Sequence, residues 1–373
     1  MAAAKTALVV GGGVAGMSCA IMLRRAGIEV SLVDLDPQWR VAGAGITITA
    51  STLRAFKAVG ILERVMEAGH THEGIRVCTV DGRPVEEVRS PPLDAGVPGA
   101  GGILRPVLHR ILSERTTALG VQVKLGVTVE SLEQDRAGVS VRLTDGTRGR
   151  YDVVVGSDGI YSRMRQLLFP DAPKPQSTGQ ACWRLMIPRP PEIDRRHFFL
   201  GGTVKCGLTP VSKEEMYLFL LEYVPDNPWR EPKQQHALLR GLLQGYGGVL
   251  ARVRDDLSES SRIVYRPLEA HILRRDWFSG RCILIGDAAH ASTPQLASGA
   301  GMAAEDGIVL AEELQGASTV EGAFRNFMKR RYERCRLVVE NSLEIGRLEI
   351  AKAPPEQQTA IVAQSLQVLA APL

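Results

Sequence analysis

Residues 283–307, ILIGDAAHASTPQLASGAGMAAEDG, combine a hydrophobic strand, a loop of small residues and a helix. The strand ends at Gly286-Asp287, and we expect the helix to begin near Gly301. Unpaired backbone N–H groups at such a helix start bind polar or anionic ligands, and Asp287 adds one carboxylate to them. This stretch therefore predicts a binding site for a polar ligand.

A second strand–glycine–helix unit opens the chain at residues 5–34, KTALVVGGGVAGMSCAIMLRRAGIEVSLVD. Its glycines follow the GxGxxG pattern, which permits a tight turn, close approach of a pyrophosphate and close helix packing. They are Gly11, Gly13 and Gly16. Asp34 closes the second strand, where it can accept hydrogen bonds from a ribose. Asp36 is a rival for that role, but it stands beside Pro37 and is interpreted as a turn residue. The unit predicts a bound dinucleotide.

The two units lie almost a chain length apart, which favours one long cofactor held at both ends. A single GxGxxG argues against a reductase with separate flavin and nicotinamide domains, and an NAD dehydrogenase would not need the second unit. The ribityl hydroxyls of FAD need an acceptor such as Asp287. The N1–C2=O edge of its isoalloxazine ring favours a positive helix end, which the backbone of residues 299–302 would supply. We therefore expect FAD.

The composition favours a soluble enzyme. With 373 residues, of which 45% are hydrophobic and 23% charged, the chain can form one large or two medium domains. A net charge of +4 is too small to indicate nucleic-acid binding. No apolar run approaches the length of a membrane span, and the N-terminus is interpreted as a first strand rather than a signal peptide. The six cysteines show no CxxC and no metal-ligand spacing, so we expect reduced thiols, no metal and a cytoplasmic location.

The order of elements predicts an α/β fold with a Rossmann-like FAD-binding domain, an inserted mainly β substrate domain and C-terminal helices. The FAD-binding domain is expected to be discontinuous, over residues 1–75, 101–175 and 278–350. The substrate domain would comprise residues 76–100 and 176–277, followed by a helical tail over residues 351–373.

Hydrophobic spacing also predicts individual elements. Single helices are expected over residues 51–68 and 105–119, and near residues 233–252. The Pro/Gly-rich residues 89–102 are expected to lack regular structure. Apolar spacing near the C-terminus, within residues 353–373, predicts a short packed helix.

Three sequence fingerprints occur together in the chain: GGGVAG (11–16), DGIYSRMR (158–165), which fits DGxxSxxR, and GDAAHASTP (286–294), which fits GDAAHxxxP. Three further segments follow in the same order: GAGITIT (43–49), LRPVLHRIL (104–112) and RRYERCRLVVENSLEIGRLE (330–349). In these motifs the chain resembles the single-component aromatic hydroxylases, the group A FAD-dependent monooxygenases of the para-hydroxybenzoate hydroxylase type. The resemblance covers the FAD-binding parts and does not extend reliably through residues 176–277.

The resemblance implies roles for residues around the ribose and pyrophosphate of FAD. Asp34 would bind the ribose, and Arg105 would lie near the pyrophosphate. Asp158 and Gly159 would support both FAD and the approach of NAD(P)H, while Arg165 would either brace that turn or form an ordinary ion pair. The glycine turn would contribute its backbone through Gly11, Gly13, Val14, Ala15 and Gly16.

A second set of residues would surround the flavin ring. Gly45 and Ile46 would run past it, Asp287 would hold pyrophosphate or ribityl oxygens, and Pro294 would shape the wall near the reactive C4a carbon. Arg40 would contact the ribityl chain or a nicotinamide phosphate, or else remain a solvated surface arginine. The helix start would complete the set with Gly299, Ala300, Gly301 and Met302. No catalytic side chain is assigned, because the flavin itself would carry the chemistry.

Some residues near these motifs allow more than one interpretation. His290 is the obvious acid–base candidate, but its place in the GDAAH turn favours a structural imidazole. Relatives often carry Gly-Gln-Gly after the proline, whereas this chain has QLASGAG (295–301). The small Ala297-Ser298 keeps close backbone approach possible, so FAD binding is still expected, with changed geometry at the flavin edge. In the substrate lobe the polar candidates are Arg184, His197, Tyr217, Tyr223 and Tyr265, each of which more often has a structural role.

The reaction implied by the resemblance consumes NADH or NADPH and O₂. Reduced FAD would form a C4a-hydroperoxide that delivers one oxygen atom to a small aromatic or N-heteroaromatic substrate, while the protein supplies positioning and a dry cavity. An epoxidase or a Baeyer–Villiger-type monooxygenase on the same scaffold is an alternative, as is an enzyme fed by a separate reductase. A remote alternative is a non-catalytic Rab-escort-like binding protein. The protein is expected to be a monomer or homodimer.

Overall fold

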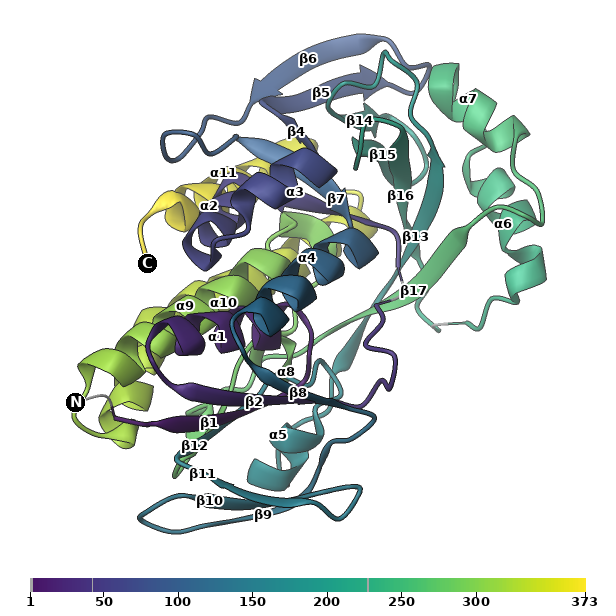
Figure 1. The fold of residues 1–373 in the computed structure, drawn as a ribbon. Helices are drawn as coiled ribbons and strands as arrows, with labels where there is room; N and C mark the ends of the chain where they lie inside the picture. Colours follow the sequence, from purple (N-terminus) through teal and green to yellow (C-terminus); the bar gives the residue numbers. More distant parts are fainter. Residues whose placement is uncertain (1–2, 42, 227) are drawn as a thin grey trace.

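A six-stranded, mostly parallel sheet forms one end of the molecule in the computed structural model, which describes residues 3–41, 43–226 and 228–373 (Figure 1). Its strands lie in the order β18 (Phe278–Ser279), β19 (Cys282–Leu284), β12 (Val153–Gly156), β1 (Thr6–Val10), β2 (Glu29–Asp34) and β8 (Gln122–Leu125). Only β18 runs antiparallel to its neighbour. Four distant segments thus build one sheet, and the carboxyl ends of β1, β12 and β19 lie side by side at one edge, where ligands bind in sheets of this kind.

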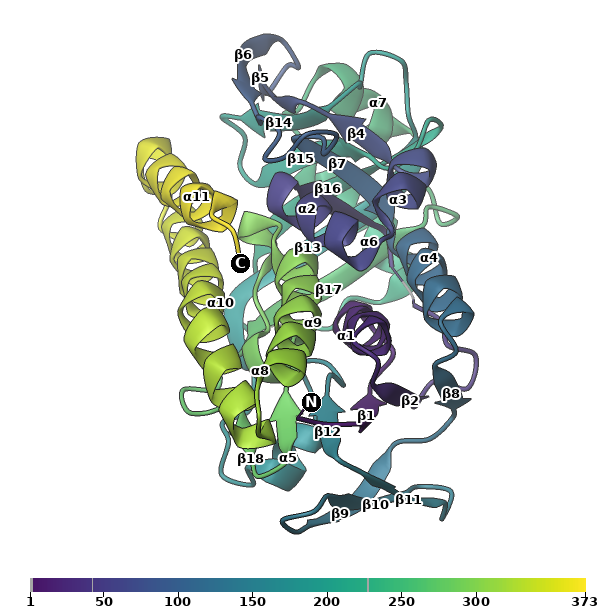
Figure 2. The ribbon, with the colours of Figure 1, turned by 60° about the vertical axis from the view of Figure 1, so that its left-hand side comes forward.

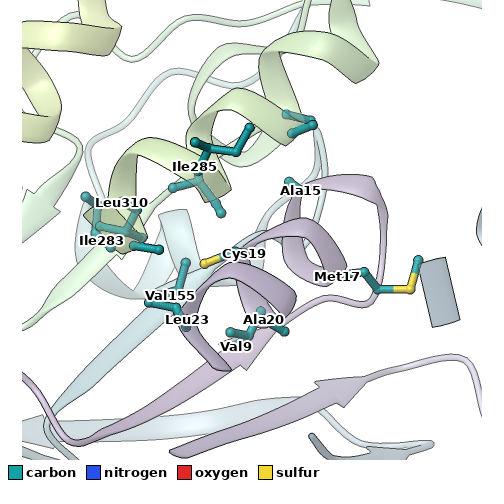
Figure 3. Packing of buried hydrophobic residues seen from close by; sticks show 14 of the residues in the cluster. Val9, Ala15, Met17, Cys19, Ala20, Leu23, Val155, Ile283, Ile285 and Leu310 are labelled. Carbon is teal, nitrogen blue, oxygen red and sulfur yellow. The ribbon is translucent and has the colours of Figure 1, made fainter. Parts of the chain in front are cut away.

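Helices α1 (Val14–Arg25) and α9 (Gly299–Gly316) pack against each other beside this sheet. An ideal Cβ on Gly307 would lie 2.5 Å from the backbone nitrogen of Cys19, so the two helices touch at backbone distance. Figure 3 shows buried apolar residues of α1, α9 and the neighbouring strands in this cluster: Val9, Ala15, Met17, Cys19, Ala20, Leu23, Val155, Ile283, Ile285 and Leu310. This contact fixes the starts of two helices from opposite ends of the sequence relative to each other.

A small antiparallel meander extends the lower end of the molecule. Its strands are β9 (Val129–Gln134), β10 (Val139–Leu143) and β11 (Arg148–Tyr151). The short helix α5 (Arg163–Leu168) follows β12 and begins at Ser162, whose side chain accepts a hydrogen bond from the N–H of Arg165. This cap fixes the turn between β12 and α5.

A seven-stranded sheet forms the opposite end of the molecule (Figure 1). Its order is β17 (Ile263–Ala270), β13 (Gln176–Pro188), β16 (Glu215–Tyr223), β15 (Lys205–Pro210), β14 (Arg196–Leu200), β5 (Gly74–Thr79) and β6 (Pro84–Arg89). The outer face packs on the 3₁₀ turn η1 (Pro232–Gln234) and on α6 (Gln235–Leu242) and α7 (Gly248–Asp255). The single helix expected near residues 233–252 is therefore wrong: two helices form, separated by a turn in which Gly245 has a positive φ.

A third, three-stranded sheet lies between the two large ones. It consists of β3 (Gly45–Thr49), β7 (Ala100–Leu104) and β4 (His70–His72), with α4 (Arg105–Ala118) following β7. The single helix expected over residues 51–68 is instead α2 (Ala50–Val59) and α3 (Leu62–Ala68), because Gly60 adopts φ +81° and ends α2. The expectation of no regular structure over residues 89–102 is wrong at its end, where β7 begins.

The C-terminal part is helical, as expected (Figure 2). After α8 (Asp287–His290) and the 3₁₀ turn η2 (Pro294–Leu296), α9 leads into α10 (Val320–Ile350) and α11 (Pro355–Ala370). Arg54 donates hydrogen bonds to the carbonyl oxygens of Ala370 and Ala371, both at 2.7 Å. Arg334 donates to those of Val368 and Leu369, at 2.9 and 2.8 Å. The last turn of α11 is thus held on α2 and α10, and the predicted α/β fold is confirmed.

Among the helices of the described residues, none combines the length and the apolar character that a membrane crossing requires.

Candidate functional site

The first glycine turn is closed toward the sheet and open on its other side. Gly11 has φ +105°, and an ideal Cβ there would lie 2.5 Å from the carbonyl oxygen of Ser157. A Cβ on Gly16 would lie 1.9 Å from the carbonyl oxygen of Gly11, so only glycine lets α1 approach the turn. A Cβ on Gly13, in contrast, would meet no heavy atom within 4 Å. The turn leaves room for a pyrophosphate at Gly13.

Both helix starts present unpaired backbone N–H groups. In α1 the first bond runs from Met17 to the carbonyl of Gly13 at 3.0 Å, and the N–H groups of residues 13–16 have no acceptor within the described chain. In α9 the first bond runs from Met302 to Ser298 at 2.9 Å, and the N–H groups of residues 299–301 likewise lack an acceptor there. Such groups carry partial positive charge and favour negatively charged ligands.

Asp34 lies beside the first glycine turn. Its Oδ2 accepts a hydrogen bond from the N–H of Gly12 at 2.6 Å, and the Trp39 indole donates to the Gly12 carbonyl at 3.1 Å. Asp36 accepts from the backbone N–H of Arg40 at 3.0 Å, which confirms its interpretation as a turn residue. Arg40 extends into solvent, and its ion pair with Asp36, at 4.0 Å, is the one it forms among the described residues. The structure thus brings Asp34 to the turn but not Arg40.

Arg105 and Asp287 are a cation and an anion at the starts of α4 and α8, and both side chains remain accessible to solvent. Burial, together with Arg184, lowers the pKa of Arg105, while burial raises the pKa of Asp287. Each group counteracts the shift of the other, because opposite charges stabilise each other. Arg105 and Asp287 can be reached by solvent although protein atoms surround them, which is expected for side chains that line a concave surface. The pair can therefore bind the phosphates and the hydroxyls of one extended ligand.

A buried ionic network holds the second turn, GDAAH. Asp306 accepts hydrogen bonds from the N–H of Gly286 at 2.8 Å and from Nε2 of His290 at 2.6 Å. Arg331, which is completely buried, donates to Asp306 at 2.7 Å and to Glu305 at 2.6 Å. Arg334 also donates to Glu305, at 2.8 Å, so three cations surround two carboxylates behind the turn and fix its position.

The charge states follow from these contacts. Burial alone would lower the pKa of His290, but Cys335 and Asp306 raise it well above its ordinary value, so the imidazole is protonated. Burial alone would raise the pKa of Asp306, but His290 and Arg331 hold it at about 2. His290 therefore serves structure, as predicted. Ligand atoms of His290, Asp306 and Cys335 lie within 4.8 Å of one another, but Arg331 already supplies the positive charge that a metal would bring.

The DGxxSxxR turn is tied to the GDAAH turn. Asp158 accepts hydrogen bonds from the Ser162 hydroxyl at 2.5 Å and from the N–H of Met164 at 2.9 Å. Burial raises the pKa of Asp158 against the effect of these bonds. Arg165 donates to the carbonyl oxygens of Ala288 at 2.9 Å and Ile160 at 2.7 Å, and among the described residues it forms no ion pair. Of the two roles expected for Arg165, the geometry supports the bracing one.

The loop after Pro294 approaches α9 through small residues. Ala297 adopts φ +51°, an uncommon conformation for a residue with a side chain. The Ser298 hydroxyl is buried and donates to the carbonyl of Leu296 at 2.9 Å, so it points back into its own loop. An ideal Cβ on Gly301 would lie 2.4 Å from Oγ1 of Thr52. Gly301 thus lets the start of α9 approach α2 closely, and the approach of Ala297-Ser298 to the flavin stays a prediction.

The inner face of the seven-stranded sheet meets the strand β3. An ideal Cβ on Gly45 would lie 2.3 Å from the ring of Tyr217, and the Tyr217 hydroxyl lies 2.8 Å from Oγ1 of Thr47. Arg184 lies close enough to Arg105 to lower the pKa of the latter. The half-buried Ile46 follows Gly45 along this strand.

The other polar candidates of the substrate lobe lie elsewhere. Tyr265 packs on Trp183 at a centroid distance of 4.7 Å, on the outer face, and Tyr223 is exposed. His197 is bound to the carbonyl of Arg195 at 2.8 Å. Four polar residues in this region were not predicted: Arg196 and Thr209 on the seven-stranded sheet, and Thr47 and His72 on the three-stranded sheet.

Comparison with known proteins agrees with this geometry. A family model described as "FAD binding domain" matches residues 4–344. The chain belongs to this family. YetM of Bacillus subtilis (strain 168) is 33% identical over 356 residues, covering 95% of this chain and 96% of YetM. The 3-amino-4-hydroxybenzoate 2-monooxygenase PtmB3 of Streptomyces platensis is 32% identical over 351 residues, covering 91% and 87% of the two chains.

A solved structure shares the fold. HpxO of Klebsiella pneumoniae, in complex with FAD and uric acid, superposes with a TM-score of 0.84 over 98% of this chain and 92% of its own, at 21% identity. Family membership and these relatives make the chain an FAD-dependent monooxygenase of the aromatic hydroxylase type. The predicted FAD is thereby confirmed, and the non-catalytic alternative is not supported.

Proposed function

We propose that this FAD-dependent monooxygenase uses NADH or NADPH and O₂ to hydroxylate a small aromatic or N-heteroaromatic compound. The observation that carries the proposal is the position of Arg105 and Asp287, which lie close enough to shift each other's pKa, between two open helix starts and next to a sheet face that bears Tyr217. The similarity to HpxO, which was solved with uric acid, supports the choice of a small ring compound.

The residues present fit FAD along its length. The N-terminus of α1 and Arg105 would bind the pyrophosphate, and Asp34 the ribose. Asp287 would accept hydrogen bonds from ribityl hydroxyls, while Gly45 and Ile46 run past the flavin ring. A turn that served only packing would not need the open space over Gly13, so this space supports a bound ligand.

When bound, FAD would supply electron transfer from NAD(P)H and activation of O₂. The N-terminus of α9 would stabilise negative charge on the N1–C2=O edge of the ring, because its free N–H groups carry partial positive charge. Pro294 would form the wall on that side. Tyr217, hydrogen-bonded to Thr47, would place a proton-carrying hydroxyl where the substrate meets the flavin edge.

The test is a screen of aromatic acids, phenols and hydroxypyridines with the purified, FAD-loaded protein. A substrate should accelerate NAD(P)H oxidation and yield a product heavier by one oxygen atom, labelled when ¹⁸O₂ is used. A colourless protein that fails to take up FAD would contradict the proposal. Stimulated oxidation that yields only peroxide would mark the compound as an effector.

The same screen separates the alternative chemistries. Oxidation of NAD(P)H by the protein alone would exclude the version fed by a separate reductase. The position of the added oxygen, determined by NMR of the product, distinguishes a phenol from an epoxide or from the ester of a Baeyer–Villiger reaction.

A further inference from the structure

A cavity of about 370 Å³ lies beside two connections between the six-stranded and the seven-stranded sheet. The first connection, residues 169–175, leads from α5 into β13, and the second, residues 271–277, leads from β17 into β18. Residues of both connections line the cavity, together with the adjoining strand ends and α10. None of the residues that we assign to FAD or name as substrate contacts is among them. The cavity is therefore separate from the site described above.

Backbone hydrogen bonds hold the second connection in place. The N–H of His271 donates to the carbonyl of Ala291 at 3.0 Å. Two residues later, the N–H of Leu273 donates to the carbonyl of Ala289 at 2.9 Å. This wall of the cavity is thus paired with the end of the GDAAH turn.

Side chains join the second connection to the first. Arg275 forms an ion pair with Asp171 at 3.0 Å, and its guanidinium carbon lies 5.0 Å from the centroid of the Phe169 ring. The cavity therefore has defined walls, as small-molecule sites usually do, and its volume falls within their range of roughly 300–1,000 Å³.

The charged groups of the cavity leave one positive charge in excess. Arg275 is paired with Asp171, and Arg274 is paired with Glu340 of α10 at 2.8 Å. Lys174, which also lines the cavity, is exposed and forms no ion pair among the described residues. An anionic group of a ligand can pair with this ammonium without displacing a protein carboxylate.

Part of the cavity wall is apolar. Val339 and Leu343, one turn apart on α10, line it together with Pro173 and Ile272 of the two connections. Val339 is buried, whereas 38% of the surface of Leu343 is exposed. Covering that surface with an apolar chain is favourable, because it removes the surface from water.

His271 adds a polar group that carries no charge at neutral pH. Burial lowers the pKa of His271 to about 4, and the nearby Arg165 and His290 act in the same direction. Its Nε2 is buried and has no hydrogen-bond partner among the described residues. The imidazole can therefore form a hydrogen bond with a ligand, but the excess charge of the cavity is that of Lys174 alone.

We propose that this cavity is a second binding site, which takes a small carboxylate with an apolar chain. The carboxylate would pair with Lys174, and the chain would cover Leu343. A single unpaired cation matches a monoanion better than a phosphate, since both arginines already bind carboxylates of the protein. The inference goes beyond the proposed function and does not depend on it.

The test is calorimetric titration of the FAD-loaded protein with butanoate, octanoate and octan-1-ol. Octanoate should bind once per chain and at least about tenfold more tightly than butanoate, because more methylene groups are buried. It should bind about fivefold more tightly than octan-1-ol, the effect of one exposed ion pair. Added salt should reduce the difference between octanoate and octan-1-ol, because it screens exposed charges.

Substitutions then assign the binding to this cavity. Lys174→Gln should weaken octanoate binding about fivefold and leave octan-1-ol unchanged, whereas Lys174→Arg should keep most of the affinity. Leu343→Glu should weaken the binding of both compounds about tenfold or more, since it places a charge in the apolar wall. Lys213→Gln changes an exposed lysine in the turn between β15 and β16, is the matched control and should change nothing.

Two results would overturn the inference. One is octanoate that binds no more tightly than butanoate. The other is octanoate affinity that stays unchanged in both Lys174→Gln and Leu343→Glu, which would place the bound molecule elsewhere. Because both side chains are exposed, the variants should fold, and thermal unfolding followed by circular dichroism checks this.

Discussion

The two glycine-rich turns at residues 11–16 and 286–290 are held in place by different forces. The turn at residues 11–16 rests on contacts between backbone segments, and a methyl group at Gly16 would strike the carbonyl of Gly11. The turn at residues 286–290 rests on a buried network of charges around Asp306. Steric contacts depend little on pH, whereas charged groups must stay ionised. The two turns should therefore lose their structure under different conditions.

Removing Arg331, the cation at the centre of the buried network, should have the largest effect on the free energy of unfolding. Arg331→Met removes the guanidinium that binds both Asp306 and Glu305, leaving His290 to bind Asp306 and Arg334 to bind Glu305, and should lower the free energy of unfolding by about 3–5 kcal/mol. Chemical denaturation monitored by circular dichroism measures this. Arg325→Gln removes an exposed helical ion pair with Glu321 and is the control, with an expected change below about 0.5 kcal/mol. Equal effects of the two substitutions would contradict the role given to the buried network.

Adding one methyl group should break the first turn. Gly16→Ala should destabilise the protein by about 1–3 kcal/mol through overpacking and should reduce FAD retention, measured as flavin absorbance after gel filtration. Gly241→Ala is a suitable control, because a Cβ there meets nothing within 4 Å. That change should be neutral or stabilise by up to about 1 kcal/mol. Full FAD retention in Gly16→Ala would contradict the conclusion that this turn has no room for a methyl group at residue 16.

Acid should weaken the second turn before the first. The pKa of Asp306 is about 2 in the folded protein, below its ordinary value of 3.8. A carboxyl whose pKa is lowered on folding stabilises the protein above the unfolded pKa, and this contribution is lost as the pH falls from about 4 to 2. We expect a loss of about 2 kcal/mol over this range, measured by urea unfolding at each pH. In Asp306→Asn the free energy of unfolding should no longer fall by this amount between about pH 4 and pH 2. A pH profile identical to that of the unmodified protein would contradict the role of Asp306.

The smallest effect on stability should come from the ligand-facing acid of the second turn. Asp287→Ala should leave unfolding nearly unchanged but weaken FAD binding about 10- to 100-fold, the effect of losing one or two hydrogen bonds to a charged acceptor. Equilibrium dialysis of FAD measures it. Asp171→Ala, at an exposed ion pair with Arg275, is the control. Unchanged flavin content in Asp287→Ala would refute its assignment.

Local patterns predicted much of this site, because the features involved are encoded over a few residues. The GxGxxG turn, the position of Asp34 and the strand that ends at Gly286-Asp287 all depend on short spacings. The helix start near Gly301 was placed within two residues of Gly299. The charge partners of the GDAAH turn were not predicted, since Asp306 and Arg331 belong to different helices and meet only through packing.

The substrate lobe was less predictable for a related reason. An alternating strand has two faces, but its sequence does not say which of them packs on the outer helices and which faces the rest of the protein. Arg196 lies on β14, which pairs in parallel with β5 more than a hundred residues earlier in the chain. That long-range pairing decides its surroundings. The predicted single helix over residues 51–68 failed for a local reason, because Gly60 takes a left-handed conformation that its neighbours do not reveal.

The arginine contacts at the end of α11 have a practical consequence for protein engineering. Arg334 binds both the carbonyls of the last turn and the carboxylate of Glu305, at 2.8 Å. Trimming the chain before Val368 would remove those acceptors and disturb an arginine that touches the buried charges. A purification tag appended after Leu373 would leave every one of these bonds intact. Variants for crystallisation should therefore be shortened elsewhere.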